Sequence, residues 1–177
     1  DGGSFEPVNE GFVSRSLLSA ESDEKSLYAI SQYEGTFVKS SAEAWQPVPF
    51  RRELLAESPV GDWFETAVNP YNKNEWLRAS RLGLTKSNDG GKTWRTIQSE
   101  WIRSVHFHPK RKGLCFALRQ QRVFWSPDAG EHWYWFPATE DAHLSFEKLR
   151  MSPAFPDLLF AVSPNRGIYV QTLPQIR

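Results

Sequence analysis

The sequence has little cysteine, no long apolar run and no excess of charge of either sign. Its single cysteine, Cys115, excludes an internal disulfide and a zinc site built from cysteines. No apolar run approaches the roughly 20 residues of a membrane-spanning helix. Lys and Arg together number 21, as do Asp and Glu, so the formal net charge is +0. This balance predicts no general basic surface for nucleic acid or membranes.

Aromatic residues, in contrast, are abundant: they make up 14% of the chain and include eight Trp. Large rings suit sheets that pack face to face. Apolar runs of strand length recur between Gly, Pro, Asn and Asp, which is typical of an all-β protein. The chain has no convincing amphipathic helix, because the one helical turn that residues 52–57 could form is followed by Pro59. We therefore expect one all-β domain over residues 1–177.

An internal repeat of roughly 40–48 residues, the length of a four-stranded propeller blade, runs through the chain. Its copies lie at about 12–48, 62–97, 102–137 and 146–172. Three copies carry an X-Pro step between their first two strands, which favours an extended-then-turn geometry. The last copy lacks its fourth strand, whereas residues 4–8 parallel the fourth strand of the first copy. We expect residues 4–8 to complete the last blade.

Two stretches, residues 87–94 and 126–133, share the pattern Ser-x-Asp-x-Gly-x-x-Trp. Short Ser and Asp side chains can bond the backbone of their own turn, and Gly supplies a positive φ. The Trp begins the next strand and brings a large apolar surface to the core. The pattern predicts a stapled hairpin in each stretch. Its defining residues are Ser87, Asp89, Gly91, Trp94, Ser126, Asp128, Gly130 and Trp133.

These two motifs resemble the Asp-box, or BNR repeat, of sialidases, sortilin-type receptors, some glycoside hydrolases and the Asp-box photosystem assembly factors. The resemblance implies a β-propeller of four-stranded antiparallel blades with Asp-box hairpins. In that family the box is a folding device that lies away from the functional face. The chain opens like the end of a further box, so we expect a partial ring or the C-terminal part of a larger propeller, with remaining blades from a missing N-terminal part or another chain.

By analogy with the family, partners bind where the second-to-third strand turns and the links between blades meet. These turns are residues 31–34, 80–82, 119–121 and 163–166, and the links are 49–62, 98–101 and 137–145. The segments are rich in Arg, Glu, Gln and aromatic residues. The partner-binding candidates are Tyr33, Arg51, Arg52, Arg81, Trp101, Arg119 and Arg166.

Three other features invite a functional interpretation. His106 and His108 alternate along a strand and could share a face as metal ligands, but we favour a plain strand end before Pro109. Residues 108–113 form the basic cluster of the chain, which could contact phosphate or an acidic partner, but we favour a solvated turn. Residues 133–136 alternate as an outer strand, so one pair of rings should pack between blades and the other pair could be exposed.

Catalysis by a sialidase would need three Arg, a Tyr paired with a Glu, and an Asp. Residues 49–53 contain Phe-Arg but not the Ile-Pro of the sialidase string, and Arg81, Arg119 and Arg166 are the candidate Arg trio. Another glycosidase would need two carboxylates about 5–9.5 Å apart. The acidic residues on candidate loops are Glu53, Asp62, Glu100, Glu140 and Asp141, and none of them stands in a distinctive motif.

The sequence thus predicts a non-catalytic interaction or scaffold module, with no cofactor and no metal. By the resemblance, it is an extrinsic accessory or assembly subunit of a larger, membrane-bound complex such as a photosystem. Its partners are proteins rather than nucleic acid, and its compartment is extracytoplasmic: periplasmic, lumenal or secreted. The alternative is a carbohydrate-active enzyme or a sugar-binding lectin.

Overall fold

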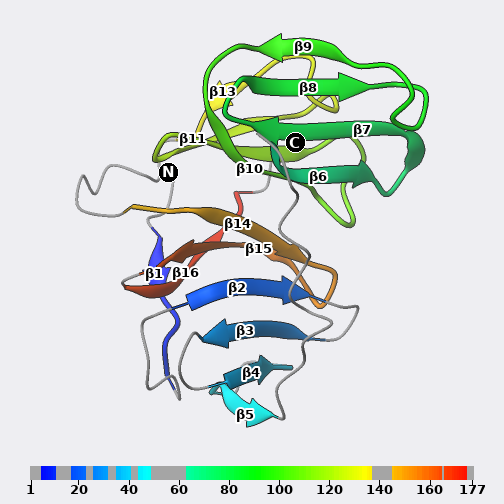
Figure 1. Cartoon of the computed structure of the whole chain (residues 1–177). Coiled ribbons are helices and arrows are strands. Elements are labelled where there is room, and N and C mark those ends of the chain that lie inside the picture. The colour runs from blue at the N-terminus through cyan, green and yellow to red at the C-terminus, as the bar shows by residue number, and fades with distance from the viewer. Residues whose placement is uncertain are drawn as a thin grey trace. The chain divides into compact units, whose positions relative to one another are not determined.

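The computed structural model describes residues 5–10, 17–22, 26–31, 35–40, 44–48, 63–136, 145–164 and 166–174. Within these residues all regular secondary structure is β-strand, arranged as four four-stranded antiparallel sheets (Figure 1). This confirms the all-β class predicted from the apolar runs. The chain clusters into two compact units, unit 1 with residues 1–57 and 141–177, and unit 2 with residues 58–140. The single domain over residues 1–177 stays a prediction.

Unit 2 contains two sheets, each with its strands in sequence order. The first comprises β6 (Trp63–Asn69), β7 (Asn72–Ser80), β8 (Gly83–Ser87) and β9 (Arg95–Gln98). The second comprises β10 (Ile102–Phe107), β11 (Cys115–Arg119), β12 (Arg122–Ser126) and β13 (Tyr134–Trp135).

Unit 1 contains the other two sheets. One comprises β2 (Leu17–Ser22), β3 (Leu27–Ser31), β4 (Gly35–Lys39) and β5 (Gln46–Val48). The other has the order β1-β16-β15-β14 and comprises β1 (Glu6–Pro7), β14 (Lys148–Ser152), β15 (Phe155–Ser163) and β16 (Gly167–Thr172). The two ends of the chain therefore share one sheet.

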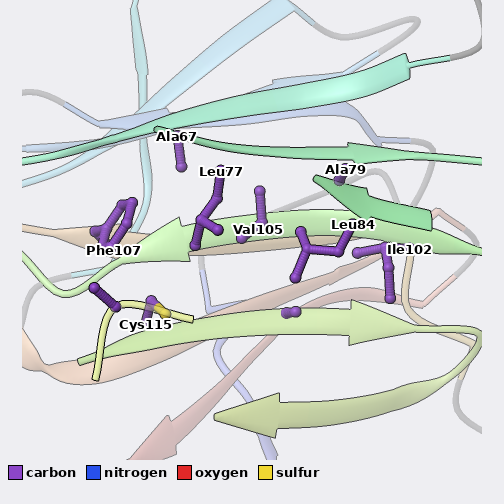
Figure 2. Packing of buried hydrophobic residues seen from close by; sticks show 10 residues of the cluster. Ala67, Leu77, Ala79, Leu84, Ile102, Val105, Phe107 and Cys115 are labelled. Atoms are coloured by element: carbon purple, nitrogen blue, oxygen red, sulfur yellow. The ribbon is translucent and has the colours of Figure 1, made fainter. Parts of the chain in front are cut away.

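Alternating side chains build the core of unit 2. In antiparallel pairing, opposed residues project to the same face. Val105 pairs with Ala117, which in turn pairs with Phe124, so one row of side chains crosses β10, β11 and β12. This face packs on Leu77 and other buried residues of the preceding sheet, as Figure 2 shows. Phe116 and Leu118 on the opposite face of β11 are buried as well, so this central strand is apolar on both faces.

In unit 1 the N-terminal segment is held at several points. Glu6 and Pro7 pair with β16, and Val8 N donates to Ile168 O over 2.9 Å. Trp45 Nε1 donates to Val8 O over 2.7 Å. Gly167 leaves room for the Asn9 side chain, because a Cβ at this position would lie 2.3 Å from Asn9 Oδ1. Contacts on both sides thus fix β1 beside β16.

Three strands extend beyond the apolar runs of the repeat. β2 continues through Glu21 and Ser22, because both residues pair with β3. β7 and β15 begin at Asn72 and Phe155, because their hairpins continue past a β-bulge. In the described part of the chain, no helix is long and apolar enough to cross a membrane.

Candidate functional site

The turns of unit 2 form two groups, because successive antiparallel strands place their turns alternately at opposite ends of a sheet. The motif end comprises residues 69–74, 88–94, 108–114 and 127–133. The link end comprises residues 81–82, 99–101 and 120–121, together with the adjoining ends of the strands.

The first Ser-Asp motif closes on itself at the motif end. Ser87 Oγ donates to Asp89 Oδ1 over 2.7 Å and accepts from Gly91 N over 2.8 Å. Asp89 also accepts from the Thr93 amide, and the Thr93 hydroxyl donates to its other oxygen over 2.6 Å. Hydrogen bonds from the Thr93 hydroxyl and amide, and then from Ser87, hold the pKa of Asp89 far below its usual range. Trp94 Nε1 donates to Gly91 O over 2.9 Å.

The second motif repeats these bonds. Ser126 Oγ donates to Asp128 Oδ1 over 2.8 Å and accepts from Gly130 N over 2.9 Å, and Trp133 Nε1 donates to Gly130 O over 3.0 Å. His132 replaces Thr93, with its amide 2.9 Å and its Nδ1 2.6 Å from the Asp128 oxygens. Burial raises the pKa of Asp128, but the bonds from His132 and Ser126 outweigh it and lower the pKa to about 2. Both carboxylates are thus occupied by their own turns.

An ionic cluster connects the two motif hairpins across the sheets. The buried Lys86 amine lies 2.7 Å from Glu131 Oε1 and 3.7 Å from Glu75 Oε1. Arg95 binds the same Glu131 carboxylate. Hydrogen bonds from Lys86 and then from Arg95 lower the pKa of Glu131. The chemistry of the motif end is therefore structural rather than reactive.

The link end contains an open pocket of about 520 Å³. Its lining comes from three segments: the β9–β10 link supplies Trp101, the start of β10 supplies Arg103, and the β11–β12 turn supplies Gln120, Gln121 and Arg122. Arg103 is the residue skipped by the register shift between Ile102 and Ser104. Such a bulge re-aims a side chain, which explains why a strand residue reaches the pocket. Among the residues that the structure describes, those that line the pocket include no carboxylate.

Arginines and aromatic rings alternate around this pocket. The Arg103 guanidinium lies 4.2 Å from the Trp101 ring centroid, and that of Arg81 lies 5.9 Å from it. Arg122 lies 5.7 Å from the Trp135 ring. Such stacking holds the planar guanidinium groups in place beside the pocket.

The structure brings together some of the predicted partner-binding residues. Arg81 and Trp101 are in contact, and Arg119 lies at the same end, 4.3 Å from the Phe124 ring and 3.3 Å from Glu100 Oε2. Arg166 is an exposed residue of unit 1. Tyr33, Arg51 and Arg52 lie outside the described residues.

Arg103 and Arg122 line the pocket but were not among the predicted partner-binding residues, because both lie within strands rather than turns or links. Arg122 was recognisable, because it directly follows the turn that supplies Gln120 and Gln121. Arg103 gave no such signal, since only the bulge directs it to the pocket.

The aromatic run at residues 133–136 does not divide into a packed pair and an exposed pair, as alternation predicted. Tyr134 and Trp135 are adjacent, yet both are about half exposed, while Phe136 is buried and meets Phe116 with ring centroids 6.2 Å apart. The reason is that β13 has only two residues, and Trp133 belongs to the motif turn.

His106 in β10 and His108, just after this strand, have separate surroundings. His106 Nε2 lies 3.6 Å from Glu65 Oε1, whereas His108 is buried and its Nδ1 accepts from the Lys110 and Arg111 amides. In the described ranges, no three His, Cys, Asp or Glu side chains could hold a metal ion. Cys115 is a buried free thiol, and burial raises its pKa to about 12.

Of the five candidate catalytic acids, the structure describes Glu100. Glu100 pairs with Arg119, as noted above. The other four candidates, Glu53, Asp62, Glu140 and Asp141, lie outside the described residues.

Comparison with known proteins identifies the fold. No family model matches the chain, and no curated protein matches it. Among solved structures, YCF48 from Cyanidioschyzon merolae has a TM-score of 0.51 at 15% identity, over 91% of this chain and 52% of that one. YCF48 bound to D1 peptide has the same TM-score and identity, over 92% and 52%. The GH74 xyloglucanase from Xanthomonas campestris has a TM-score of 0.50 at 16% identity, over 85% and 26%.

These structures are β-propellers. The chain spans about half the length of the YCF48 structures and about a quarter of the xyloglucanase. At such low identity the likeness establishes the fold alone. The chain, with its four antiparallel sheets, therefore has the fold of part of a β-propeller.

Proposed function

We propose that this protein is a non-catalytic binding module of the Asp-box propeller family, whose link end holds an acidic segment of a partner protein. In this proposal it is an extrinsic accessory or assembly subunit of a larger complex, and it works outside the cytoplasm. The two Ser-Asp motifs support the family assignment, because both make the hydrogen bonds of a stapled hairpin with the same atoms.

The pocket at the link end is the observation that carries the function. Arg103 and Arg122 offer guanidinium groups, Gln120 and Gln121 offer amides, and Trp101 offers a ring face. Guanidinium forks bind carboxylates in a bidentate manner, and amides can bond an extended peptide backbone. Stacking on Trp101 and Trp135 holds the two arginines before a ligand arrives, which lowers the entropy cost of binding.

The fold comparison is compatible with this role. A solved structure with a similar fold is YCF48 bound to D1 peptide, so a propeller of this kind can hold a peptide. The identity of 15% carries no residue from that site to this one. The assignment of the link end therefore depends on the geometry of this chain.

A carbohydrate ligand is the alternative. Exposed Trp rings beside amide side chains also suit a sugar, and Trp101 with Gln120 and Gln121 has this composition. Hydrolysis would need two carboxylates on either side of a glycosidic bond. The residues that line the pocket supply cations and amides instead, which favours binding over hydrolysis.

A peptide-display selection on the immobilised full chain tests the proposal. We expect the selected peptides to be enriched in Asp and Glu, and Arg122→Ala to weaken their binding roughly 10-fold or more, the effect of losing a charged hydrogen-bond partner. The matched control is Lys110→Ala, which removes one positive charge from the motif end. Selection of neutral peptides, equal losses in both variants, or release of reducing ends from xyloglucan would contradict the proposal.

A further inference from the structure

The motif end of unit 2 displays lysines without acidic partners. Lys73, Lys92, Lys110 and Lys112 are all exposed. None of the four forms a salt bridge with another described residue. They come from three different turns, so the positive charge is spread over this end.

The carboxylates of the same end are already engaged. Asp89 and Asp128 accept hydrogen bonds from their own turns. Glu131 binds Lys86 and Arg95, and Glu75 accepts from the Asn69 amide over 2.6 Å. Hydrogen bonds from neutral donors leave the charges of Asp89 and Asp128 in place. The seven Lys and Arg of this end, those of the ionic cluster included, nevertheless outnumber its four Asp and Glu, so an approaching surface meets a positive field.

Two apolar side chains stand beside these lysines. Val68 is 45% exposed at the end of β6, and Tyr71 is 48% exposed at the tip of the β6–β7 hairpin, two residues from Lys73. Tyr is favoured at the boundary between lipid and water, where its ring is buried and its hydroxyl stays wet. A basic surface with an amphipathic ring is the composition of a peripheral membrane contact.

The motif end is also held rigidly. Gly90 N donates to Asn74 O over 3.0 Å, which ties the first motif turn to the β6–β7 hairpin. Ala129 N donates to Gly113 O over 2.7 Å, which ties the second motif turn to the basic turn. Within the basic turn, His108 Nδ1 accepts two amides. The lysines are therefore presented in a fixed array.

The net charge of the whole chain does not indicate the basic surface of unit 2, because the charges of the two units cancel. Unit 2 holds 12 of the 21 Lys and Arg but only 8 of the 21 Asp and Glu, so it carries +4 and unit 1 carries −4. We propose that the motif end of unit 2 docks on an anionic lipid bilayer, with its lysines at the headgroups and Tyr71 in the interface. This site is separate from the link end: β10, with six residues, spans about 20 Å, well beyond the Debye length of about 8 Å.

Vesicle co-sedimentation of the full chain tests the electrostatic part. The probes are vesicles of phosphatidylcholine alone and of an equimolar mixture with phosphatidylglycerol. We expect binding to the mixed vesicles only, and a loss of roughly 30-fold in Lys110→Ala/Lys112→Ala, from about 1 kcal/mol per lysine. The charge-matched control Arg81→Ala/Arg122→Ala, at the link end, should bind nearly as well as wild type. Equal losses in both variants, or no binding by wild type, would overturn the proposal.

A fluorophore tests the orientation. Tyr71→Cys can be labelled selectively with an environment-sensitive dye, because the native Cys115 thiol is buried. We expect a blue shift on adding mixed vesicles, and no shift for the control Leu82→Cys, whose parent side chain is 74% exposed at the link end. A shift at position 82, or at neither position, would overturn the proposal. Polyglutamate is compared with the vesicles in the link-end variant Arg81→Ala/Arg122→Ala, which removes two arginines of the proposed acidic-peptide site. Polyglutamate that binds this variant as tightly as the vesicles do would indicate an acidic protein partner at the motif end instead, and would overturn the proposal.

Discussion

The two ends of unit 2 use the same strands for opposite purposes. At the motif end, carboxylates accept hydrogen bonds from their own turn, as Asp128 does, or pair with cations of the neighbouring sheet, as Glu131 does. At the link end, arginines stack on rings around an open pocket. Carboxylates that accept hydrogen bonds within their own turns stabilise the fold, whereas cations that line an open pocket can bind a ligand. We therefore expect substitutions of the motif-end carboxylates to reduce stability, and substitutions of the link-end arginines to reduce peptide binding.

The largest effect on stability should come from Glu131→Gln. This substitution removes the carboxylate 2.7 Å from the buried Lys86 amine and leaves only Glu75 nearby, at 3.7 Å. Removing one partner of a fully buried pair costs about 3–5 kcal/mol, and we expect about 2 kcal/mol here because Glu131 is partly exposed. Urea unfolding of the purified chain measures the difference.

Lys86→Met is the matched control for the ionic cluster of Lys86 and Glu131. It removes the buried charge and keeps most of the apolar stem, so it should cost less than Glu131→Gln. If Lys86→Met proved the more damaging of the two, the cluster would contribute net stabilisation as an ion pair, and the explanation by an unpaired buried charge would be wrong.

Asp128→Ala should have the next largest effect. It removes the acceptor for the amides of Glu131 and His132 and for the Ser126 hydroxyl. Hydrogen bonds to charged groups contribute about 1.5–3 kcal/mol when buried, and we expect about 1–2 kcal/mol for this partly exposed turn. Thermal unfolding of the variant provides the test, and an unchanged melting temperature would show that water replaces the carboxylate without cost.

The sequence predicts a structural feature well when the residues that form it are close together in the chain. Every bond within a Ser-Asp motif joins residues at most four positions apart, so the pattern of residues 87–94 predicts the turn by itself. The all-β class and the repeat followed from local runs in the same way. Both are properties of short segments.

The link-end pocket could be predicted only in part, because it depends on tertiary contacts. Trp101 lies on a link that the repeat located, but Arg103 reaches the pocket through a bulge that no local pattern encodes. The charge separation between the units also stayed hidden, because unit 1 joins residues 1–57 to 141–177. The hydrogen bonding of local turns could be predicted from the sequence, whereas the packing of segments distant in the sequence could not.

Acid should weaken the motif end in a defined range of pH. The pKa of Asp128 falls from 3.8 to about 2 in the folded state, so folding favours the ionised form. The stability from this group is complete above pH 3.8 and is lost as pH falls towards about 2. We expect the melting-temperature difference between wild type and Asp128→Asn to shrink over this range. A constant difference would show that the Asp128 charge contributes nothing to folding.

Substitutions at the link end should have the smallest effect on stability. In Arg122→Ala the side chain lost is exposed and stacks on the half-exposed Trp135, and no buried group is left without a partner. We expect the free energy of unfolding to stay within about 0.5 kcal/mol of wild type. The same variant is expected to weaken binding of the selected acidic peptides. Stability and binding measured on one protein sample therefore separate the roles of the two ends. A large loss of stability in Arg122→Ala would mean that the link end also stabilises the fold.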